Sequence, residues 1–462
     1  MTPQETVERA LALSTADGCV VVADEHSHAD LRWAENSLTT NGVSRSRTLT
    51  VIATVGGERG TAVGTIARGG ATADQIEAVV REAEHAARTG TAADDARPLA
   101  RPDDTAPAGP WDDPPAETSV RVFGSLAPQL GEAFTQASHE GRLLFGFAEH
   151  DLTSTFLGTG TGVRLRHDQP TGRLELNVKS ADYARSVWTG VGTDDFSDVD
   201  AHALEAGLVT KLDWAKRRVD LPAGRYETVL PPSAVADLYV YLYASSAARD
   251  AHDGRSVFSA TGGGTRIGER LGDTPFTLRS DPAAPGLRSC PFVVARSSSA
   301  ADSVFDNGLP IGPVSWIDRG TLSALLQTRH TASLTDSPAT FAVDNLIAEG
   351  GDDTVDTDAV VANTSRGLLL TSLWYIRPVD PRTLLFTGLT RDGVYLVEGG
   401  EVVGAVNNFR FNESPVEMLR RILEIGGTRR TLARELGDYF TRTAMPTLRV
   451  ADFNMSTVSD AS

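Results

Sequence analysis

The sequence predicts an α+β protein in which two small α+β modules precede a large β-rich domain, barrel-like or sandwich-like. Three observations predict this arrangement. Helix signals flank strand-like runs in the modules at 1–97 and 118–220. A Pro-rich stretch, 98–117, separates these modules and is typical of an extended linker. Hairpin signals then dominate residues 221–455.

The first module begins with a capping box at Thr2 to Glu5, with Pro3 at the first helical position. This pattern predicts a helix to about Ser14, followed by a buried strand from Cys19 to Ala23. Further strands are expected at about 31–40, 48–55 and 61–68, with turns at Asn41-Gly42 and Gly56-Gly57. An apolar stripe predicts a second helix from about residue 76: Ile76, Val79, Val80, Ala83 and Ala87.

The second module follows a stretch, 89–117, that carries six prolines and should be the first region cut by proteases. The pattern predicts a helix over about 119–138 and a helix that Asp198 caps. Four short strands are expected between these helices, at 143–147, 153–157, 163–166 and 174–178.

The β-rich domain has hairpin signals at Asp318-Arg319-Gly320, Asp392-Gly393 and Gly399-Gly400. Two helices are expected to interrupt it, at about 232–248 and 414–425.

Composition limits the possible functions. The formal net charge of −18 disfavours binding to nucleic acid or anionic membranes. The two cysteines, Cys19 and Cys290, form no metal-ligand or disulfide pattern. The N-terminus has no signal-peptide pattern, and no apolar run is long enough to cross a bilayer. These features indicate a soluble cytoplasmic protein.

Three stretches of the β-rich domain, in this order and spacing, resemble the TldD/PmbA metallopeptidase family, also called "modulator of DNA gyrase". The resemblance covers roughly residues 20–450. The first stretch comprises GRYETVLPP (224–232), GRSVF (254–258) and IGERLG (267–272). The second comprises DNGLP (306–310) and WIDRGTL (316–322), and the third is DGVYLVEGGEV (392–402).

The resemblance implies that the metal-binding helix of TldD-type subunits, with its HExxxH motif, should follow Pro232. There, two histidines one turn apart hold a metal and a glutamate activates water. In this chain the helix reads AVADLYVYLYA (234–244), which contains neither His nor Glu. We therefore carry over no catalytic residue and expect no metal in this chain. In lacking this motif, the chain resembles the TldE/PmbA-like branch of the family. That resemblance implies a heterodimer with a TldD-like subunit, which would hold zinc or iron.

Three other histidines, His252 and the pair His26 and His28, have acidic neighbours and are compared with a metal site. His252 lies beside the position of the lost motif, near Asp250 and Asp253, and is a weak alternative ligand. His26 and His28 have acidic neighbours, but the pattern places them in a polar turn between strands, which favours solvated loop histidines.

Tyr239 and Tyr243 share one face of the predicted helix at i, i+4. They are candidates for substrate contact in a peptide groove, with core packing as the alternative interpretation.

The leading hypothesis is a TldE/PmbA-like, non-catalytic or co-catalytic subunit of a complex that hydrolyses peptides or unfolded proteins. One alternative is a self-standing metal-dependent hydrolase with a site outside the family helix. Another is a protein-binding modulator, for example of DNA gyrase.

Overall fold

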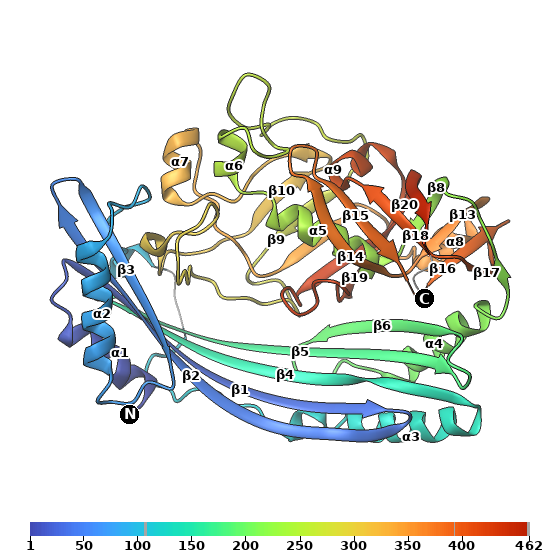
Figure 1. Cartoon of the computed structure of the whole chain (residues 1–462), viewed down its shortest axis with the longest axis horizontal. Helices are drawn as coiled ribbons and strands as arrows, with labels where there is room; N and C mark the ends of the chain where they lie inside the picture. Colours follow the sequence, from blue (N-terminus) through green and yellow to red (C-terminus); the bar gives the residue numbers. More distant parts are fainter. Residues whose placement is uncertain (106–108, 392, 460–462) are drawn as a thin grey trace.

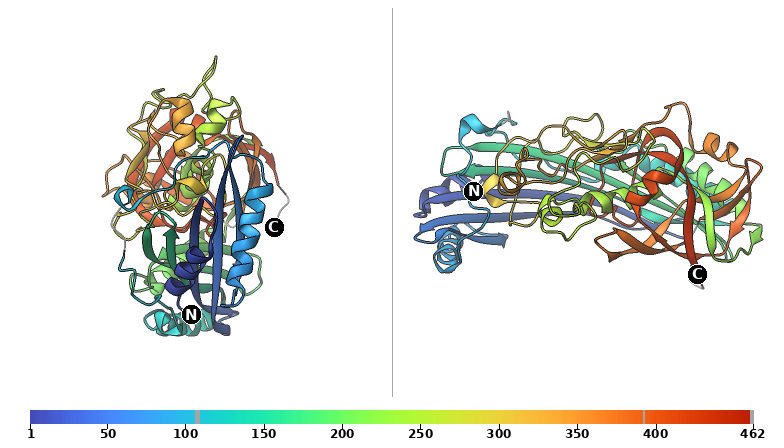
Figure 2. Two further views of the ribbon diagram at one scale, coloured as in Figure 1. Left: turned by 90° about the vertical axis from the view of Figure 1, so that its left-hand side faces the viewer. Right: turned by 90° about the horizontal axis from the view of Figure 1, so that it is seen from above.

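The computed structural model describes residues 1–105, 109–391 and 393–459. It confirms the α+β class and the large β-rich C-terminal domain. A long, twisted sheet lies along one side of the molecule, and the C-terminal domain covers one of its faces (Figures 1 and 2). No helix among the described residues is both long and apolar enough to span a membrane.

The N-terminal half forms one six-stranded antiparallel sheet, in the order β3-β2-β1-β4-β5-β6. Because β1 of the first module pairs with β4 of the second over 14 residue pairs, Val20↔Thr159 to Trp33↔Gly146, the two modules share a single sheet. The strands are β1 (Gly18–Ala34), β2 (Ser37–Gly57), β3 (Gly60–Gly69), β4 (Arg142–Thr159), β5 (Arg164–Ser180) and β6 (Ser186–Thr193).

These strands are longer than the sequence suggested, and several predicted breaks are wrong. The β1–β2 turn is at Glu35 and Asn36, which both have positive φ, so Asn41-Gly42 lies inside β2. His26 and His28 lie within β1 rather than in a turn. The four short strands expected in the second module merge into β4 and β5. The physical reason is that a long paired neighbour supplies hydrogen bonds even where the local sequence is polar.

The outer face of the sheet is apolar and covered by helices. Helix α1 (Pro3–Leu13), with the predicted capping box at Thr2, and α2 (Ile76–Thr89) pack on one end of it. Helices α3 (Leu126–His139) and α4 (Ala201–Trp214) pack on the other end. The cap of α4 is Asp200, two residues after the predicted Asp198.

The Pro-rich segment starts on the inner side of the sheet, where Leu99 and Ala100 pack near Val20. Its residues 111–117 lie on the outer face, and residues 106–108 lie outside the described residues. Its carbonyl groups are held by Arg166, whose guanidinium donates to Pro110 O and Pro114 O over 3.2 and 2.8 Å. The backbone N–H of Ala116 also donates to Ser154 Oγ. The segment is therefore extended but docked on the sheet.

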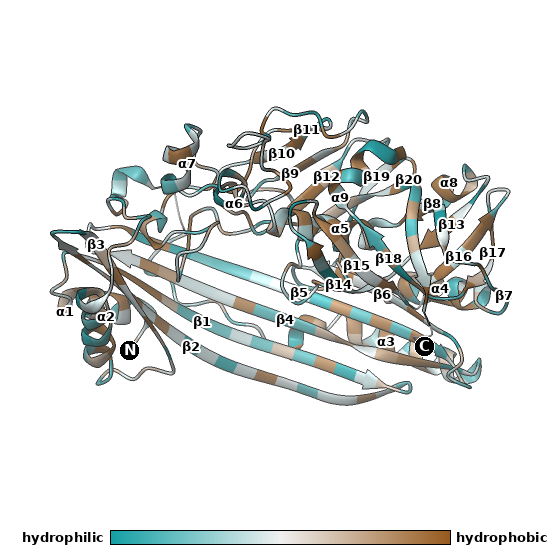
Figure 3. Cartoon of the chain, turned by 45° about the horizontal axis from the view of Figure 1, so that its top comes forward, coloured by the Kyte–Doolittle hydropathy of each residue, from teal (hydrophilic) through white to brown (hydrophobic). Residues whose placement is uncertain are grey.

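The inner face of the sheet is largely polar in its middle and faces the C-terminal domain. Figure 3 shows the alternation of hydrophobic and hydrophilic residues along these strands. On β1 the apolar Val21, Ala23 and Ala29 point outward, whereas Asp24, His26 and His28 share the inner face. Strand alternation thus places charged and imidazole side chains opposite the second domain.

The C-terminal domain is built on a 14-stranded sheet around one large apolar core. The hairpin turns predicted at Arg319-Gly320 and Gly399-Gly400 are confirmed by positive φ angles, whereas Asp392-Gly393 includes residue 392, outside the described residues. Its strands are β7 (Arg218–Val219), β8 (Gly224–Leu230), β9 (Thr277–Ser280), β10 (Val314–Asp318), β11 (Thr321–Leu322), β12 (Leu346–Glu349), β13 (Arg366–Leu370), β14 (Leu373–Asp380), β15 (Leu385–Thr390), β16 (Val394–Glu398), β17 (Glu401–Val406), β18 (Phe409–Glu413), β19 (Ile422–Thr431) and β20 (Thr443–Val458).

The helices of this domain are mostly short. The first predicted helix corresponds to α5 (Pro232–Ala244), but the helix expected over 414–425 ends early, because β19 begins at Ile422. The remaining helices are α6 (Ala248–His252), α7 (Arg329–Thr335), α8 (Thr357–Ala362) and α9 (Pro415–Met418), and the 3₁₀ turns are η1 (Pro102–Asp104), η2 (Val120–Phe123), η3 (Val304–Asp306) and η4 (Leu419–Arg421).

Candidate functional site

Helix α5 occupies the position where the resemblance places a metal-binding helix, and it is enclosed by the core. From Ala234 to Tyr243, every residue except Tyr241 is buried. A helix that is apolar nearly all round is a core helix. Because α5 has neither His nor Glu and no open face, its residues do not fit the metal centre that the resemblance implies.

The two tyrosines proposed for substrate contact lie in different surroundings. Tyr239 is completely buried, stacks near Phe276 and donates to Pro415 O over 3.4 Å. Tyr243 is 5% exposed, and its hydroxyl donates to Val343 O and accepts the Val343 N–H. Tyr243 also lines a cavity of about 390 Å³, and Tyr239 has no exposed surface. The proposed substrate-contacting wall therefore narrows to Tyr243, since Tyr239 presents no surface to a peptide.

One acidic side chain on α5 escaped the sequence analysis. Asp237 is completely buried, and its Oδ1 accepts the backbone N–H of Glu435 over 2.8 Å. Its Oδ2 has no hydrogen-bond partner among the described residues. Burial raises the pKa of Asp237 well above its ordinary value. Because Asp237 is enclosed by the core, neither solvent nor a substrate can reach its carboxyl group.

A cleft opens between the inner face of the sheet and the C-terminal domain, beside the C-terminal end of α5. One cavity of about 390 Å³ is lined by Tyr243 and by Thr155 of β4. A second, of about 530 Å³, lies along the part of β5 that β6 does not pair. The two cavities share His167, Gln169 and Ile311, so they adjoin each other, and together they are called the cleft below.

The cleft is equipped for binding rather than for activating water. Burial lowers the pKa of His167, whose Nε2 lies 3.0 Å from Gln169 Oε1. Burial raises the pKa of the Cys290 thiol to about 12, so this cysteine is no nucleophile at neutral pH. Amide and imidazole groups within reach of apolar walls are typical of ligand pockets.

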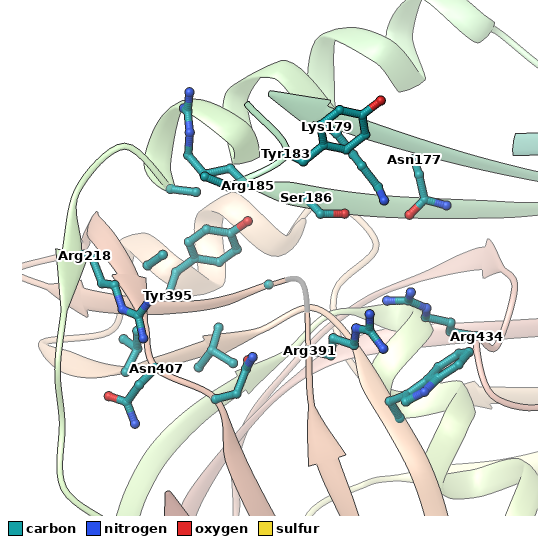
Figure 4. Close-up of a pocket in the computed structure, with 18 of the residues that line it drawn as sticks. Asn177, Lys179, Tyr183, Arg185, Ser186, Arg218, Arg391, Tyr395, Asn407 and Arg434 are labelled. Atoms are coloured by element: carbon teal, nitrogen blue, oxygen red, sulfur yellow. The ribbon is translucent and has the colours of Figure 1, made fainter. Parts of the chain in front are cut away.

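A third cavity, of about 730 Å³, lies at the far end of the inner face and is lined by several positively charged side chains. Figure 4 shows Lys179 of β5 pointing toward Arg391 and Arg434 of the C-terminal domain. The Arg434 guanidinium lies 5.1 and 4.8 Å from the ring centres of Trp188 and Trp374. The Lys179 ammonium lies 5.1 Å from the Phe145 ring centre. Such stacked cations are suited to anionic groups, and their separation in the sequence hid them.

The histidines that the sequence places in a turn belong to a group on the inner face. His26 and His28 of β1 meet Asp151 of β4, and one ligand atom from each lies within 4.8 Å of the others. Asp151 Oδ1 is 3.2 Å from His26 Nε2 and 2.8 Å from His28 Nδ1. This is the one group of three metal-ligand side chains found in the part of the chain that the structure describes. No sequence signal marked Asp151, because strand pairing alone brings it to the histidines.

His252, the weak alternative metal ligand, ends α6 and belongs to no such group within residues 1–105, 109–391 and 393–459. Its acidic neighbours Asp250 and Asp253 bind Arg255, and Asp253 also binds Arg249.

Comparison with known proteins supports the resemblance seen in the sequence. The chain has the fold of TldE from Thermococcus kodakarensis, with a TM-score of 0.78, 13% identity and coverage of 98% of this chain and 99% of that one. A proposed modulator of DNA gyrase from Bacteroides thetaiotaomicron aligns with a TM-score of 0.77 and 14% identity, covering 99% of this chain and 98% of that chain. Another from Thermotoga maritima aligns with a TM-score of 0.74 and 16% identity, covering 98% and 99%.

No curated protein matches the chain in sequence. The model of the PmbA/TldA metallopeptidase C-terminal domain, however, matches residues 223–457, which is half of the chain. This chain therefore belongs to the TldD/PmbA metallopeptidase family.

Proposed function

We propose that this chain is the TldE/PmbA-like subunit of a two-subunit metallopeptidase, in which a TldD-like partner holds the zinc or iron that activates water. The proposal rests on the composition and burial of α5. At the family's metal-binding position it lacks His and Glu, and the core encloses it. Amide hydrolysis needs a metal or base to activate water, and neither is available there.

The contribution of this chain would be to bind and orient the peptide. The cleft beside Tyr243 borders the part of β5 that β6 does not pair, where an extended peptide could bind. Orienting a substrate beside a metal on the partner can lower the barrier by several kcal/mol, on the order of effective-molarity effects. The substrates would be peptides or unfolded proteins.

Reconstitution tests the division of labour. The purified chain, a TldD-like subunit and their mixture are each assayed with an unfolded protein as substrate, and co-elution on a sizing column reports the complex. We expect little cleavage by this chain alone and at least about 10-fold more cleavage by the mixture than by the partner alone. Robust, metal-dependent cleavage by this chain, free of any partner, would instead favour the self-standing hydrolase.

A variant of the cleft tests the binding role. Ile311 lines both cavities, so Ile311→Arg should fill the cleft and raise the KM of the complex. Val379→Arg, a matched change at a residue that is 56% exposed, should leave KM unchanged. Equal kinetics for both complexes would exclude the cleft as the substrate site.

A further inference from the structure

The group formed by His26, His28 and Asp151 lies where two central strands pair. In the β1–β4 register His28 is opposite Asp151, and His26 is opposite Thr153. All four side chains point to the inner face, because residues two apart on a strand share a face. Since β1 is paired on both sides, by β2 and β4, the backbone holds these side chains in fixed positions.

The spacing of the three side chains fits a metal ion. A tetrahedral zinc ion with bonds of about 2.0–2.1 Å separates neighbouring ligand atoms by about 3.3 Å. The observed separations of Asp151 Oδ1 from His26 Nε2 and His28 Nδ1 are 3.2 and 2.8 Å. All three ligand atoms also lie within 4.8 Å of one another, so an ion placed between them would be within reach of both imidazoles and the carboxylate.

The second ring nitrogen of His26 also has a hydrogen-bond partner of the kind found around metal sites. His26 Nδ1 lies 3.1 Å from Thr153 Oγ1, which fixes the ring and leaves Nε2 for the ion. His28 Nε2 lies 3.7 Å from Asp30 Oδ1, which is beyond hydrogen-bond distance. Metal-bound histidines characteristically make outer contacts like that of His26 with their second nitrogen.

The group is accessible from solvent. The side chains of His26, His28 and Asp151 are 37%, 25% and 35% exposed, so an ion can reach them without unfolding of the chain. Along β4, Asp151 and Thr153 are followed on the same face by Thr155, which lines the cleft. Two imidazoles and one carboxylate also leave at least one coordination position open.

We propose that His26, His28 and Asp151 bind a divalent transition-metal ion of the zinc class at the inner face of the sheet, distinct from the family position on α5. This proposal revises the expectation that the chain carries no metal. It does not depend on the proposed peptidase complex, because the site belongs entirely to this chain.

The test uses the full-length chain, stripped of metal with a chelator and titrated calorimetrically with zinc at neutral pH. We expect one equivalent to bind. His28→Gln keeps a hydrogen-bonding side chain but removes a ligand, and should weaken binding by at least about 100-fold. Thr153→Val removes only an outer contact and should weaken it by about 10-fold. His252→Gln is the matched control and should bind like the wild type.

The visible absorption of bound cobalt gives a second measurement, and it would not depend on these residues if their role were only structural. Binding of cobalt by the wild type should produce the intense visible absorption of a four-coordinate ion, which His28→Gln and Asp151→Asn should lose while their circular dichroism stays unchanged. Absence of zinc binding by the wild type would overturn the proposal. Binding that survives His28→Gln but is lost in His252→Gln would overturn it as well.

Discussion

Helix α5 and the middle of strand β1 are two places where this chain could hold a metal, and they differ in accessibility. All but one residue of α5 from Ala234 to Tyr243 is buried, so polar groups there would have to be enclosed. Strand β1 alternates, with apolar residues toward the helices and polar residues toward the cleft. Side chains alternate between the two faces of a strand, so one face can be exposed to solvent while the other is buried. A helix that is surrounded by a core has no solvent-exposed face. The comparison teaches that the surroundings of an element decide whether it can carry chemistry.

The largest expected effect that sharpens this comparison is on α5. Tyr239→Ala should lower the free energy of unfolding by about 3–5 kcal/mol, because it leaves a cavity in the core. Tyr239→Phe, which removes only the long hydrogen bond to Pro415 O, should cost about 1 kcal/mol. Urea unfolding measures both values. A small effect of Tyr239→Ala would show that α5 is open and could still contact a substrate.

A substitution of Arg166 tests how firmly the Pro-rich segment is held on the outer face of the sheet. Arg166→Ala removes the donor to Pro110 O and Pro114 O and should cost about 2 kcal/mol. Residues 98–117 remain the region that we expect proteases to cut first, and the variant should be cut there faster than the wild type. Mass spectrometry of the early fragments locates the cuts. Earliest cuts within 221–455 in both proteins would contradict the expectation.

Asp237 provides a pH-dependent comparison within α5. Because burial raises the pKa of Asp237 in the folded state, its contribution to stability is present below pH 4 and is lost as pH rises through that pKa. Asp237→Asn has no such loss, so it should have a higher Tm than the wild type at pH 7. The difference should disappear near pH 4. Thermal unfolding of both proteins across pH 4–8 measures this, and parallel curves would show that Asp237 is ionised.

The smallest effect on the free energy of unfolding is expected for a substitution on the solvent-exposed face of β1. Without metal, His26→Gln should change the free energy of unfolding by no more than about 0.5 kcal/mol, because the side chain is 37% exposed. Urea unfolding of the metal-free protein measures the change. A loss as large as that of Tyr239→Ala would mean that the histidines serve the fold, and the contrast between the two elements would fail.

Local patterns predicted what depends on local physics. The capping box of α1, the apolar stripe of α2 and the turns at Arg319-Gly320 and Gly399-Gly400 are all set by neighbouring residues. Strand lengths could not be predicted in this way. Residues 24–30 are polar except for Ala29, and only pairing with β2 and β4 makes them part of β1. Asn41-Gly42 has turn chemistry, but the hairpin register overrules it.

By itself, the sequence determined the α+β class, the family resemblance and the lack of His and Glu on α5, because motifs and composition are local properties. Only the tertiary structure decided which of these residues meet. It buried Tyr239, left Tyr243 at a cleft and docked the Pro-rich segment on the sheet. It also placed Asp151 beside two histidines more than 120 positions away in the chain. Strand pairing and domain packing create such neighbours, and no local pattern encodes them.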